Sequence, residues 1–529
     1  MVGPSRDVPR VHQMTLDFSR CRDVWVQDTA KDAGGFWSPP PSHVRIGVEH
    51  LIRNPFFMLA DEMGGMKTAQ AIIAAQLLFE RGDIDRVISI APATVRSVWF
   101  DETLGELAKH LWLPSDITEF HAKSRTWFYG DRATPQRLQW IITNYDFVRS
   151  SARLTQLLAI SGPKTLLILD EAHACKNYKA KQTKACLQLR HSCGRVWLLT
   201  GTPIAHNPLD MYAQGRIMDP SILGCASYFV ARARYATITT RGGFPKVTGW
   251  KNLDDLQRRF APYVLRRLKK DCLDLPPALP AVMLTATLTP ETWKIYKEMR
   301  DDLCIWLDQN TVSTAQQAAV KVMRLAQITS GFVGGVEDAN VSGVTTGIAP
   351  QLTHAVGREK LDIVIEWLTD MLALEPNLKL LIWTRFRAEL SRLMTELAEK
   401  FPHVALGQIH GSQKREEREL ALRLLDPRTA PVGPAVLGGT TQTGSMGLSL
   451  VAAHHVIYMS DDWSLKTRLQ ADARTDRPGQ THSCWYGNVI AVGPQGQQTI
   501  DHVILRARLG KENVATFTTA AWRQALQRE

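Results

Sequence analysis

The stretch LADEMGGMKT, from Leu59 to Thr68, places a lysine and a hydroxyl residue directly after two glycines. A lysine ammonium and the backbone N–H groups at the start of a helix can together hold phosphates. The usual phosphate-binding pattern, G-x-x-x-x-G-K-[ST], has glycine where this chain has Asp61 and Met66. The stretch therefore indicates a nucleotide site, but a chance Gly-Gly pair before Lys-Thr would look the same.

The surrounding segment, FFMLADEMGGMKTAQAIIAAQLLF, predicts a strand, a tight loop and an amphipathic helix that begins near Lys67. In this topology Lys67 would reach the β- and γ-phosphates of a nucleoside triphosphate, and the Thr68 hydroxyl would ligate Mg²⁺. We expect the backbone of Gly64, Gly65 and Met66 to complete the phosphate cradle.

The segment LLILDEAH, from Leu166 to His173, carries two carboxylates at the end of a predicted buried strand. Asp170 can hold a hydrated metal ion, and Glu171 can orient and deprotonate an attacking water. Alone, the segment fits a solvated acidic turn equally well, because short motifs recur by chance. The Lys-Thr loop at a matching strand end favours the metal-binding interpretation.

A third strand ending, LLTGTPIAHN, begins at Leu198 and offers two hydroxyl groups. Thr200 and Thr202 could sense the γ-phosphate and pass its state to the second half of the chain. A polar turn between a strand and a loop is the alternative for this segment taken singly.

Five short apolar runs alternate with helix-compatible stretches between about residues 55 and 205. They are FFMLA, RVISIAP, WIITNYD, TLLILDEAH and RVWLLTGTP, and each ends in small or polar residues. Apolar strands separated by helices indicate a parallel sheet covered on both faces, whose ligands collect at the carboxyl ends of the strands. Because the same rhythm returns between about residues 378 and 495, the fold class is α/β with two such units.

The two units define the expected domain organisation. We expect an unassigned segment at 1–40, a first lobe at 41–275 with a helical insertion at about 207–262, a helical insertion and linker at 276–355, and a second lobe at 356–529. Helical periodicity, the basic patch LRRLKKD and the glycine-rich SGFVGGVEDANVSGVTTG favour the middle assignment.

Composition narrows the class of protein. The 529 residues are too many for one hydrophobic core, and 63 basic against 52 acidic residues favour a polyanionic partner, nucleic acid first. The start lacks the apolar core of a signal peptide, and no apolar run is long enough to span a bilayer. The eight cysteines form no C-x-x-C pair. We therefore expect reduced thiols, no membrane, and a cytoplasmic protein that is nucleoid-associated or acts in the cytoplasm of an infected cell.

Further motifs follow in a recognisable order. They are HVRIGVEHL, VISIAPATVRSVW, WIITNYDF, YVLRRLKKDCLDLPP, MRLAQITSG, LLIWTRFRAEL, IHGSQKREER, TTQTGSMGLSL and QADARTDRPGQ. In this order the chain resembles the Swi/Snf-type DNA-translocating ATPases of the second helicase superfamily, whose motor is two RecA-like lobes. The likeness runs from about Ser42 to Phe517. It leaves no room for a chromatin-reading, nuclease or methyltransferase domain, so we expect a compact bacterial or phage member.

The segment QADARTDRPGQ, which begins at Gln470, is similar to the arginine-finger motif of that family. Arg474 and Arg477 are three apart, so on a helix they would share one face and meet charge developing on the γ-phosphate. An arginine finger is worth about 10³–10⁵ in rate. The resemblance makes Lys67, Glu171 and the two arginines catalytic and puts Gln470 at the nucleotide. A surface helix with salt bridges is the alternative for the arginines.

The resemblance also implies contacts to DNA phosphates, which fix register without reading sequence. In addition, Trp463 corresponds to a family tryptophan near the DNA, although a core aromatic that closes the strand is an equal alternative. We expect little sequence preference and steep salt dependence. The positions that match the phosphate contacts are Thr94, Thr143, Asn144, Thr384, Arg385 and Thr441.

Three positions depart from the family pattern. Val44 stands where a glutamine usually reads adenine, so base selectivity is expected to be loose or to use another group. Met66 replaces the glycine before the loop lysine, and its β-carbon would cost about 1–2 kcal/mol in a left-handed conformation. The third departure is the family's AGG, which is Thr443-Gly444-Ser445 here.

The resemblance implies a DNA-stimulated ATPase that uses ATP and Mg²⁺, moves along double-stranded DNA without sequence preference, and serves replication, recombination or repair. The resemblance does not imply strand separation, because family members commonly translocate along DNA without separating its strands. It does not identify protein partners either. The alternatives are an RNA helicase, since DEAH also occurs there, and an ATP-responsive DNA clamp with little turnover, motivated by Met66 and Val44.

Overall fold

The computed structural model describes thirteen stretches of the chain. The predictions for residues 1–40, for Thr94, for Thr202 and for the glycine-rich stretch after Gly334 concern residues outside the described ones. The described stretches are 42–93, 99–100, 105–120, 136–201, 203–204, 208–241, 244–273, 275–277, 279–309, 315–334, 354–427, 429–445 and 450–509.

The first lobe is built on a seven-stranded parallel sheet of order β3-β4-β2-β5-β6-β1-β9. The polar strand endings predicted from the sequence therefore meet at one edge of the sheet. In chain order the strands are β1 (Phe56–Leu59), β2 (Arg86–Ala91), β3 (Ser115–Glu119), β4 (Leu138–Asn144), β5 (Thr165–Asp170), β6 (Arg195–Leu199) and β9 (Val264–Leu265).

Helices cover both faces of this sheet, as the apolar strands predicted. Phe57 and Leu59 of β1 belong to the buried cluster of α2 (Ser42–Arg53), α3 (Lys67–Glu80) and α5 (Glu106–His110). Met58, between them, belongs to the opposite cluster, with α6 (Ser151–Ile160), α7 (Lys181–Ser192) and α8 (Asp210–Met218). Alternate residues of one strand thus fill two cores.

The helix after the phosphate loop begins at Lys67, as predicted, but it is not amphipathic. Every residue from Ala69 to Leu78 is buried. The physical reason is its position, because α3 packs closely against α2 and also contacts α5 within the buried cluster of the sheet.

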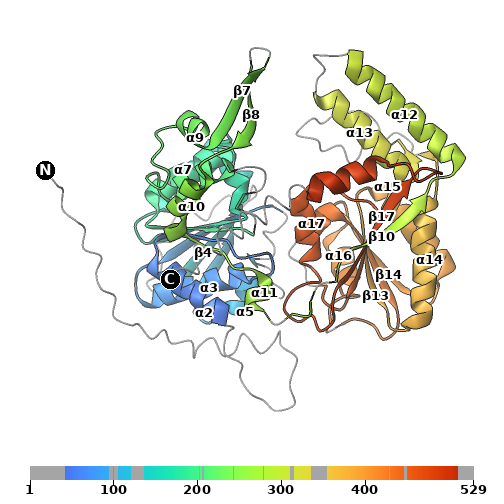
Figure 1. Cartoon of the computed structure of the whole chain (residues 1–529). Coiled ribbons are helices and arrows are strands. Elements are labelled where there is room, and N and C mark those ends of the chain that lie inside the picture. The colour runs from blue at the N-terminus through green and yellow to red at the C-terminus, as the bar shows by residue number, and fades with distance from the viewer. Residues whose placement is uncertain are drawn as a thin grey trace.

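The second lobe contains a six-stranded parallel sheet of order β10-β17-β16-β13-β15-β14. One face packs on α14 (Glu359–Leu374) and α15 (Arg387–Lys400), and the other on α16 (Arg415–Leu422) and α17 (Leu465–Asp472). Two helix-covered parallel sheets confirm the α/β fold with two RecA-like lobes (Figure 1). The strands are β10 (Val282–Thr287), β13 (Lys379–Thr384), β14 (Ala405–Ile409), β15 (Ala435–Thr440), β16 (His455–Tyr458) and β17 (Trp485–Val492).

The regions expected to be helical also contain strands. The edge strand β10 comes from the expected linker, and β7 (Ala236–Arg241) and β8 (Phe244–Trp250) form an antiparallel hairpin within the first insertion. β-branched residues of ATITTR favour a strand there. The remaining elements are α9 (Tyr228–Tyr235), α10 (Leu253–Phe260), α11 (Lys269–Cys272), α12 (Pro290–Gln309), α13 (Ala315–Thr329), β11 (Phe332–Val333) and β12 (His354–Ala355).

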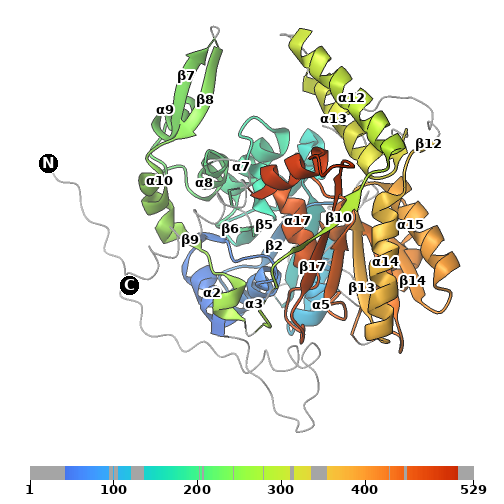
Figure 2. The ribbon, with the colours of Figure 1, turned by 45° about the vertical axis from the view of Figure 1, so that its right-hand side comes forward.

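The hairpin of β7 and β8 and the helix pair of α12 and α13 project in the same direction from the two lobes (Figures 1 and 2). Among the described residues, no helix has both the length and the apolar character needed to cross a membrane.

Candidate nucleotide and nucleic-acid site

The phosphate loop joins β1 to α3 and contains a left-handed residue other than glycine. Met66 has φ 59° and ψ 31°, and Gly64 has φ 85°. A β-carbon in this conformation costs about 1–2 kcal/mol, which explains why phosphate loops usually have glycine before the lysine. The turn nevertheless delivers the start of α3, with its N–H groups, to the mouth of the loop.

Lys67 is held at the mouth of this loop. Its Nζ donates hydrogen bonds to the carbonyl oxygens of Asp61 (2.8 Å) and Glu62 (3.1 Å). Desolvation lowers the pKa of Lys67, while the nearby Glu171 and other carboxylates oppose that shift. The ammonium is therefore poised among carboxylates at the strand ends, where an anionic ligand would find it.

Asp170 ends β5, two strands from the phosphate loop in the sheet order. Its carboxylate accepts hydrogen bonds from the indole Nε1 of Trp99 (2.8 Å) and from the backbone N–H of Glu171 (2.9 Å). Burial, and then the neighbouring charge of Glu171, raise the pKa of Asp170. Two adjacent carboxylates with incomplete charge compensation are a set of oxygen donors that fits a divalent cation.

Glu171 is the second non-glycine residue at the site with a left-handed backbone, at φ 50°. Its Oε2 lies 3.2 Å from Nδ1 of His173, and its Oε1 accepts a hydrogen bond from Nε2 of Gln470 (3.2 Å). Burial opposes ionisation, but the interaction with His173 outweighs it and lowers the pKa of Glu171. Glu171 is thus ionised and held from both lobes at once.

Thr200, at the end of β6, lies fully buried against His173, with 3.3 Å between Oγ1 and Nδ1. A polar chain therefore runs from Thr200 through His173 and Glu171 to Gln470. Thr200, Glu171 and Gln470 were predicted from the sequence, whereas His173 was not, although it is the last residue of DEAH.

Arg474 and Arg477 are not on a helix, so that premise of the sequence analysis was wrong. The helix α17 ends at Asp472, and both arginines lie in the turns that follow it. Nε of Arg474 donates to the carbonyl of Gly444 (2.6 Å). Burial, and then the charge of Arg477, lower the pKa of Arg474 to about 9, while Glu171 opposes the shift. The two guanidinium groups are close together and near lobe-one carboxylates.

Contacts that no local sequence pattern reveals hold the end of lobe one against the loop, and the contact between Lys269 and Asp476 joins the two lobes. Nζ of Lys269 donates to the carbonyl of Asp476 (2.9 Å) and pairs with its carboxylate, while the Lys269 N–H donates to Oε2 of Glu62 (2.9 Å). Arg267 pairs with Asp61, where Nε lies 2.9 Å from Oδ1. These partners are about two hundred residues apart, and no local pattern connects them.

Val44 stands in the core and not at a ligand surface. It is fully buried in the cluster shared by α2 and α3. The side chain that replaces the usual glutamine therefore packs and does not read a base.

The residues predicted to contact DNA divide into accessible and inaccessible groups. Thr143 and Thr384 are fully buried, and their hydroxyls donate to backbone carbonyls, 3.0 Å to Phe120 and 3.3 Å to Phe386. Neither can meet a phosphate while its sheet is intact, so their assignment as direct contacts needs correction. Thr441 is almost as buried.

The other predicted contacts are partly exposed. Asn144 accepts a hydrogen bond from the N–H of Phe147 (2.9 Å), and the guanidinium of Arg385 lies 5.1 Å from the ring centre of Phe386. Trp463 is also partly exposed but packs against the apolar cluster of α12 and α13. The structure thus gives Trp463 a packing role whether or not it also meets DNA.

A cavity of about 480 Å³ lies between the lobes, next to the Glu171 carboxylate, whose partner His173 lines it. Lobe one lines it with the ends of β2 and β4 and with His173, and lobe two with the start of α17. Arg149, Lys176 and Lys466 make it basic, and Lys466 is close enough to Glu171 to interact electrostatically with it. A basic groove built from both lobes suits a phosphate backbone.

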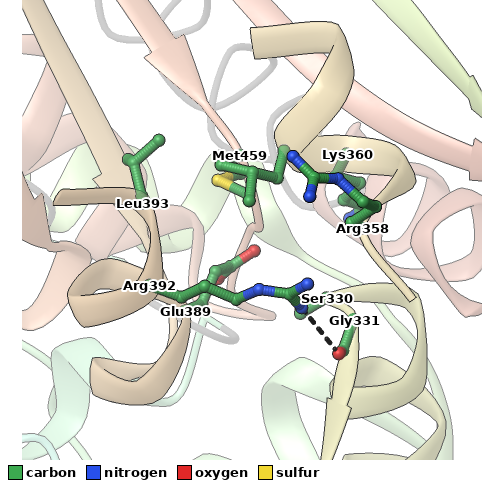
Figure 3. A pocket seen from close by; sticks show the side chains of 9 residues that line it. Ser330, Gly331, Arg358, Lys360, Glu389, Arg392, Leu393 and Met459 are labelled. Atoms are coloured by element: carbon green, nitrogen blue, oxygen red, sulfur yellow. Dashed lines mark hydrogen bonds between the residues drawn. The ribbon is translucent and has the colours of Figure 1, made fainter. Parts of the chain in front are cut away.

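A buried polar network lies within lobe two, around Ser460 and Glu389. The hydroxyl of Ser460 accepts from the N–H of Arg385 (2.7 Å) and donates to the carboxylate of Glu389, which is 2% exposed. Figure 3 shows Glu389 beside Arg392, which donates to the carbonyl of Gly331 (3.1 Å). Burial raises the pKa of Glu389 to about 7, although Lys360 opposes the shift.

Two family comparisons cover most of the chain. Residues 49–332 match the SNF2-related domain, and residues 360–479 match the helicase conserved C-terminal domain. The first match spans more than half of the chain, so the chain belongs to the SNF2-related family. This confirms the resemblance drawn from the order of the motifs.

Curated relatives share this core at low identity. The CHD3-type chromatin-remodeling factor CHR7 of Arabidopsis thaliana is 25% identical over 82% of this chain and 34% of that protein. The SWI/SNF-related matrix-associated actin-dependent regulator of chromatin subfamily A-like protein 1 of Xenopus laevis is 25% identical over 92% and 45%. The DNA repair and recombination protein RAD54-like of Danio rerio is 22% identical over 90% and 66%. This chain thus spans a third to two thirds of these relatives.

Among solved structures, the SWI2/SNF2 ATPase core of Sulfolobus solfataricus in complex with dsDNA is 21% identical, with a TM-score of 0.40. The match covers 86% of this chain and 88% of that one.

The left-handed backbone of Met66 predicts that glycine is more stabilising than alanine at this position, which is the reverse of their usual order in a helix. In a helix, alanine is more stable than glycine by roughly 1 kcal/mol. At Met66 the β-carbon strain exceeds glycine's entropic cost, so we expect Met66→Gly to be more stable than Met66→Ala by about 0.5–1 kcal/mol. Urea unfolding measures both variants, which both lose the packing of the methionine side chain beyond its β-carbon.

The matched control is Lys184, an exposed residue within α7. There, Lys184→Ala should be the more stable of the pair. An alanine advantage at Met66 as well would contradict the left-handed conformation of the loop.

The buried Glu389 predicts a pH dependence. Its folded-state pKa of about 7 lies above the ordinary 4.5, so its carboxyl binds a proton more tightly in the folded chain, and stability falls as pH rises between those values. Glu389→Gln removes this ionisation while keeping an acceptor for Ser460. We subtract the free energy of unfolding of the unmodified chain from that of the variant. This difference should be larger at pH 8 than at pH 5. A difference that is equal at both pH values would contradict the prediction.

Proposed function

We propose that the chain is a DNA-stimulated ATPase that moves along double-stranded DNA by opening and closing its two lobes. The observation that carries the proposal is the seam between the lobes. Lys67 and the carboxylates of Asp170 and Glu171 lie on its first wall, and Gln470 bonds to Glu171 from the second, with Arg474 close by.

The first wall has the groups that a triphosphate and Mg²⁺ need. We infer that the N–H groups of the loop and Lys67 bind the β- and γ-phosphates, and that Thr68 and Asp170 hold the metal. Bound Mg²⁺ would neutralise charge on the phosphates. The raised pKa of Asp170 supports this assignment, because it marks a buried carboxylate whose charge Lys67 compensates only in part.

The remaining roles follow from charge and position. Glu171 is ionised and can orient a water and accept its proton. Arg474 and Arg477 can stabilise charge that develops on the γ-phosphate, and their mutual repulsion favours an anion between or beside them. Because Gln470 already meets Glu171, small changes in lobe closure would change how Glu171 is held.

DNA would bind in the basic cavity that both lobes line. Lys466 lies in this cavity and near Glu171, and so does His173, which pairs with Glu171. A phosphate that meets Lys466 would therefore alter the electrostatic environment of the proposed base. We propose this link as the physical basis of DNA stimulation.

The cellular role that we propose is replication, recombination or repair of DNA. The relative RAD54-like of Danio rerio is named a DNA repair and recombination protein, and its match covers 90% of this chain. The basic charge of +11 supports a nucleic acid partner.

We expect the purified chain to release phosphate from ATP, with greater stimulation by duplex DNA than by RNA, and with stimulation that falls steeply between about 50 and 200 mM salt. Glu171→Gln should lower the rate by about 10²–10⁴, because it removes the base without changing the size of the side chain. Phosphate release with duplex DNA, single-stranded DNA and RNA at both salt concentrations measures this.

ATP binding to the Glu171→Gln variant serves as the control, and it should persist. Substantial turnover in this variant would remove Glu171 from the mechanism. Preferential stimulation by RNA would favour an RNA helicase, and DNA binding without phosphate release would favour an ATP-responsive clamp; either result would overturn the proposal.

A further inference from the structure

Two histidines and a glutamate meet on the second lobe, at the end of the sheet opposite to the seam. His455 is the first residue of β16, His454 precedes it, and Glu375 follows the last residue of α14. One atom from each, two imidazole nitrogens and a carboxylate oxygen, lie within 4.8 Å of one another. None of these residues takes part in the nucleotide site or in the basic cavity.

The backbone around the three residues is fixed by the sheet. His455 is in register with Trp485, the first residue of β17, and the N–H of Trp485 donates to the carbonyl of His454 (2.8 Å). The carbonyl of Glu375 accepts from the N–H of Leu378 (3.0 Å), just before β13. The three side chains therefore converge from backbone that is already ordered by secondary structure.

The distances within the group are longer than ordinary hydrogen bonds and lie close to the spacing of ligands that share one ion. Nε2 of His454 lies 3.5 Å from Oε1 of Glu375, and Nδ1 of His455 lies 3.7 Å from Oε2. Ligands at about 2.0–2.2 Å from a tetrahedral ion are roughly 3.3–3.6 Å apart. The Nδ1 atom of His455 is also buried with no hydrogen-bond partner among the described residues, which is unfavourable unless something else binds it.

We propose that Glu375, His454 and His455 bind one divalent transition-metal ion of the Zn²⁺ class. Two imidazoles and a carboxylate suit Zn²⁺, whereas Mg²⁺ prefers an octahedral set of oxygens. This site would therefore not compete for the Mg²⁺ that serves ATP.

The surroundings of the group complete such a site. The ring of His455 lies 5.7 Å from Trp367 and 5.9 Å from Trp485, so apolar rings cover one side. His482 stacks on His454 with 4.8 Å between ring centres, which restrains the orientation of that ring. The side chain of Glu375 is 32% exposed and leaves a path from solvent for the ion and for a water as fourth ligand.

A bound ion would clamp the end of α14 to the first residues of β16 and, through Trp485, to β17. These elements lie far from one another in the sequence, so the clamp would stabilise the second lobe as a unit. Because it acts on the folded lobe alone, binding should raise the thermal unfolding midpoint with metal concentration.

The test titrates Zn²⁺ into the full chain after treatment with a chelator, in millimolar Mg²⁺, against a chromogenic zinc indicator. We expect one Zn²⁺ per chain at this site and an affinity loss of at least about tenfold in His454→Gln, His455→Gln and Glu375→Gln. His403→Gln, which removes an exposed histidine elsewhere on the same lobe, is the matched control and should bind as the unmodified chain does.

Co²⁺ provides a second measurement that does not depend on stability. The unmodified chain should give the strong visible absorption of tetrahedral Co²⁺, and Glu375→Gln should lose it while its circular dichroism stays unchanged. Absence of binding to the unmodified chain, or binding that all three variants retain, would overturn the proposal. ATPase activity in Mg²⁺ alone is independent of this result.

Discussion

Two carboxylates next to each other at the end of a buried strand are the electrostatic constraint on which the site depends. Burial and mutual repulsion make it unfavourable to ionise both Asp170 and Glu171 unless positive groups approach. Lys67 approaches from the phosphate loop, and Arg474 from the other lobe. The same charge that would hold a metal and orient water therefore also draws the two lobes together.

The fold satisfies this constraint because it brings the carboxyl ends of many strands close together. Because both sheets are parallel and covered on both faces, each places the carboxyl ends of its strands at one edge, and the two edges meet at the seam. Backbone strain is concentrated at this place, since two of the three non-glycine residues with positive φ in the described chain, Met66 and Glu171, lie there. The unstrained packing of the two cores opposes the cost of those two conformations.

The sequence predicted what local patterns can specify. Apolar runs with polar endings predicted the strands, and the motifs selected Lys67, Asp170 and Glu171, which the structure brings together, because these signals occupy a few consecutive residues. The helix periodicity assumed for Arg474 was wrong, since α17 ends two residues earlier. Pairs such as Lys269 with Asp476 could not be predicted from the sequence, because only folding brings residues that are so far apart in the chain together. Thr143 was predicted to contact DNA but is fully buried, because the position of a residue in a motif does not reveal its exposure.

The central claim is that a guanidinium from the second lobe acts on a phosphate held by the first. The most direct measurement is single-turnover ATP hydrolysis by Arg474→Ala, with ATP and DNA affinities determined alongside. The account predicts a loss of about 10³–10⁵ in the hydrolysis rate with little change in either affinity. Hydrolysis at the unmodified rate would contradict it.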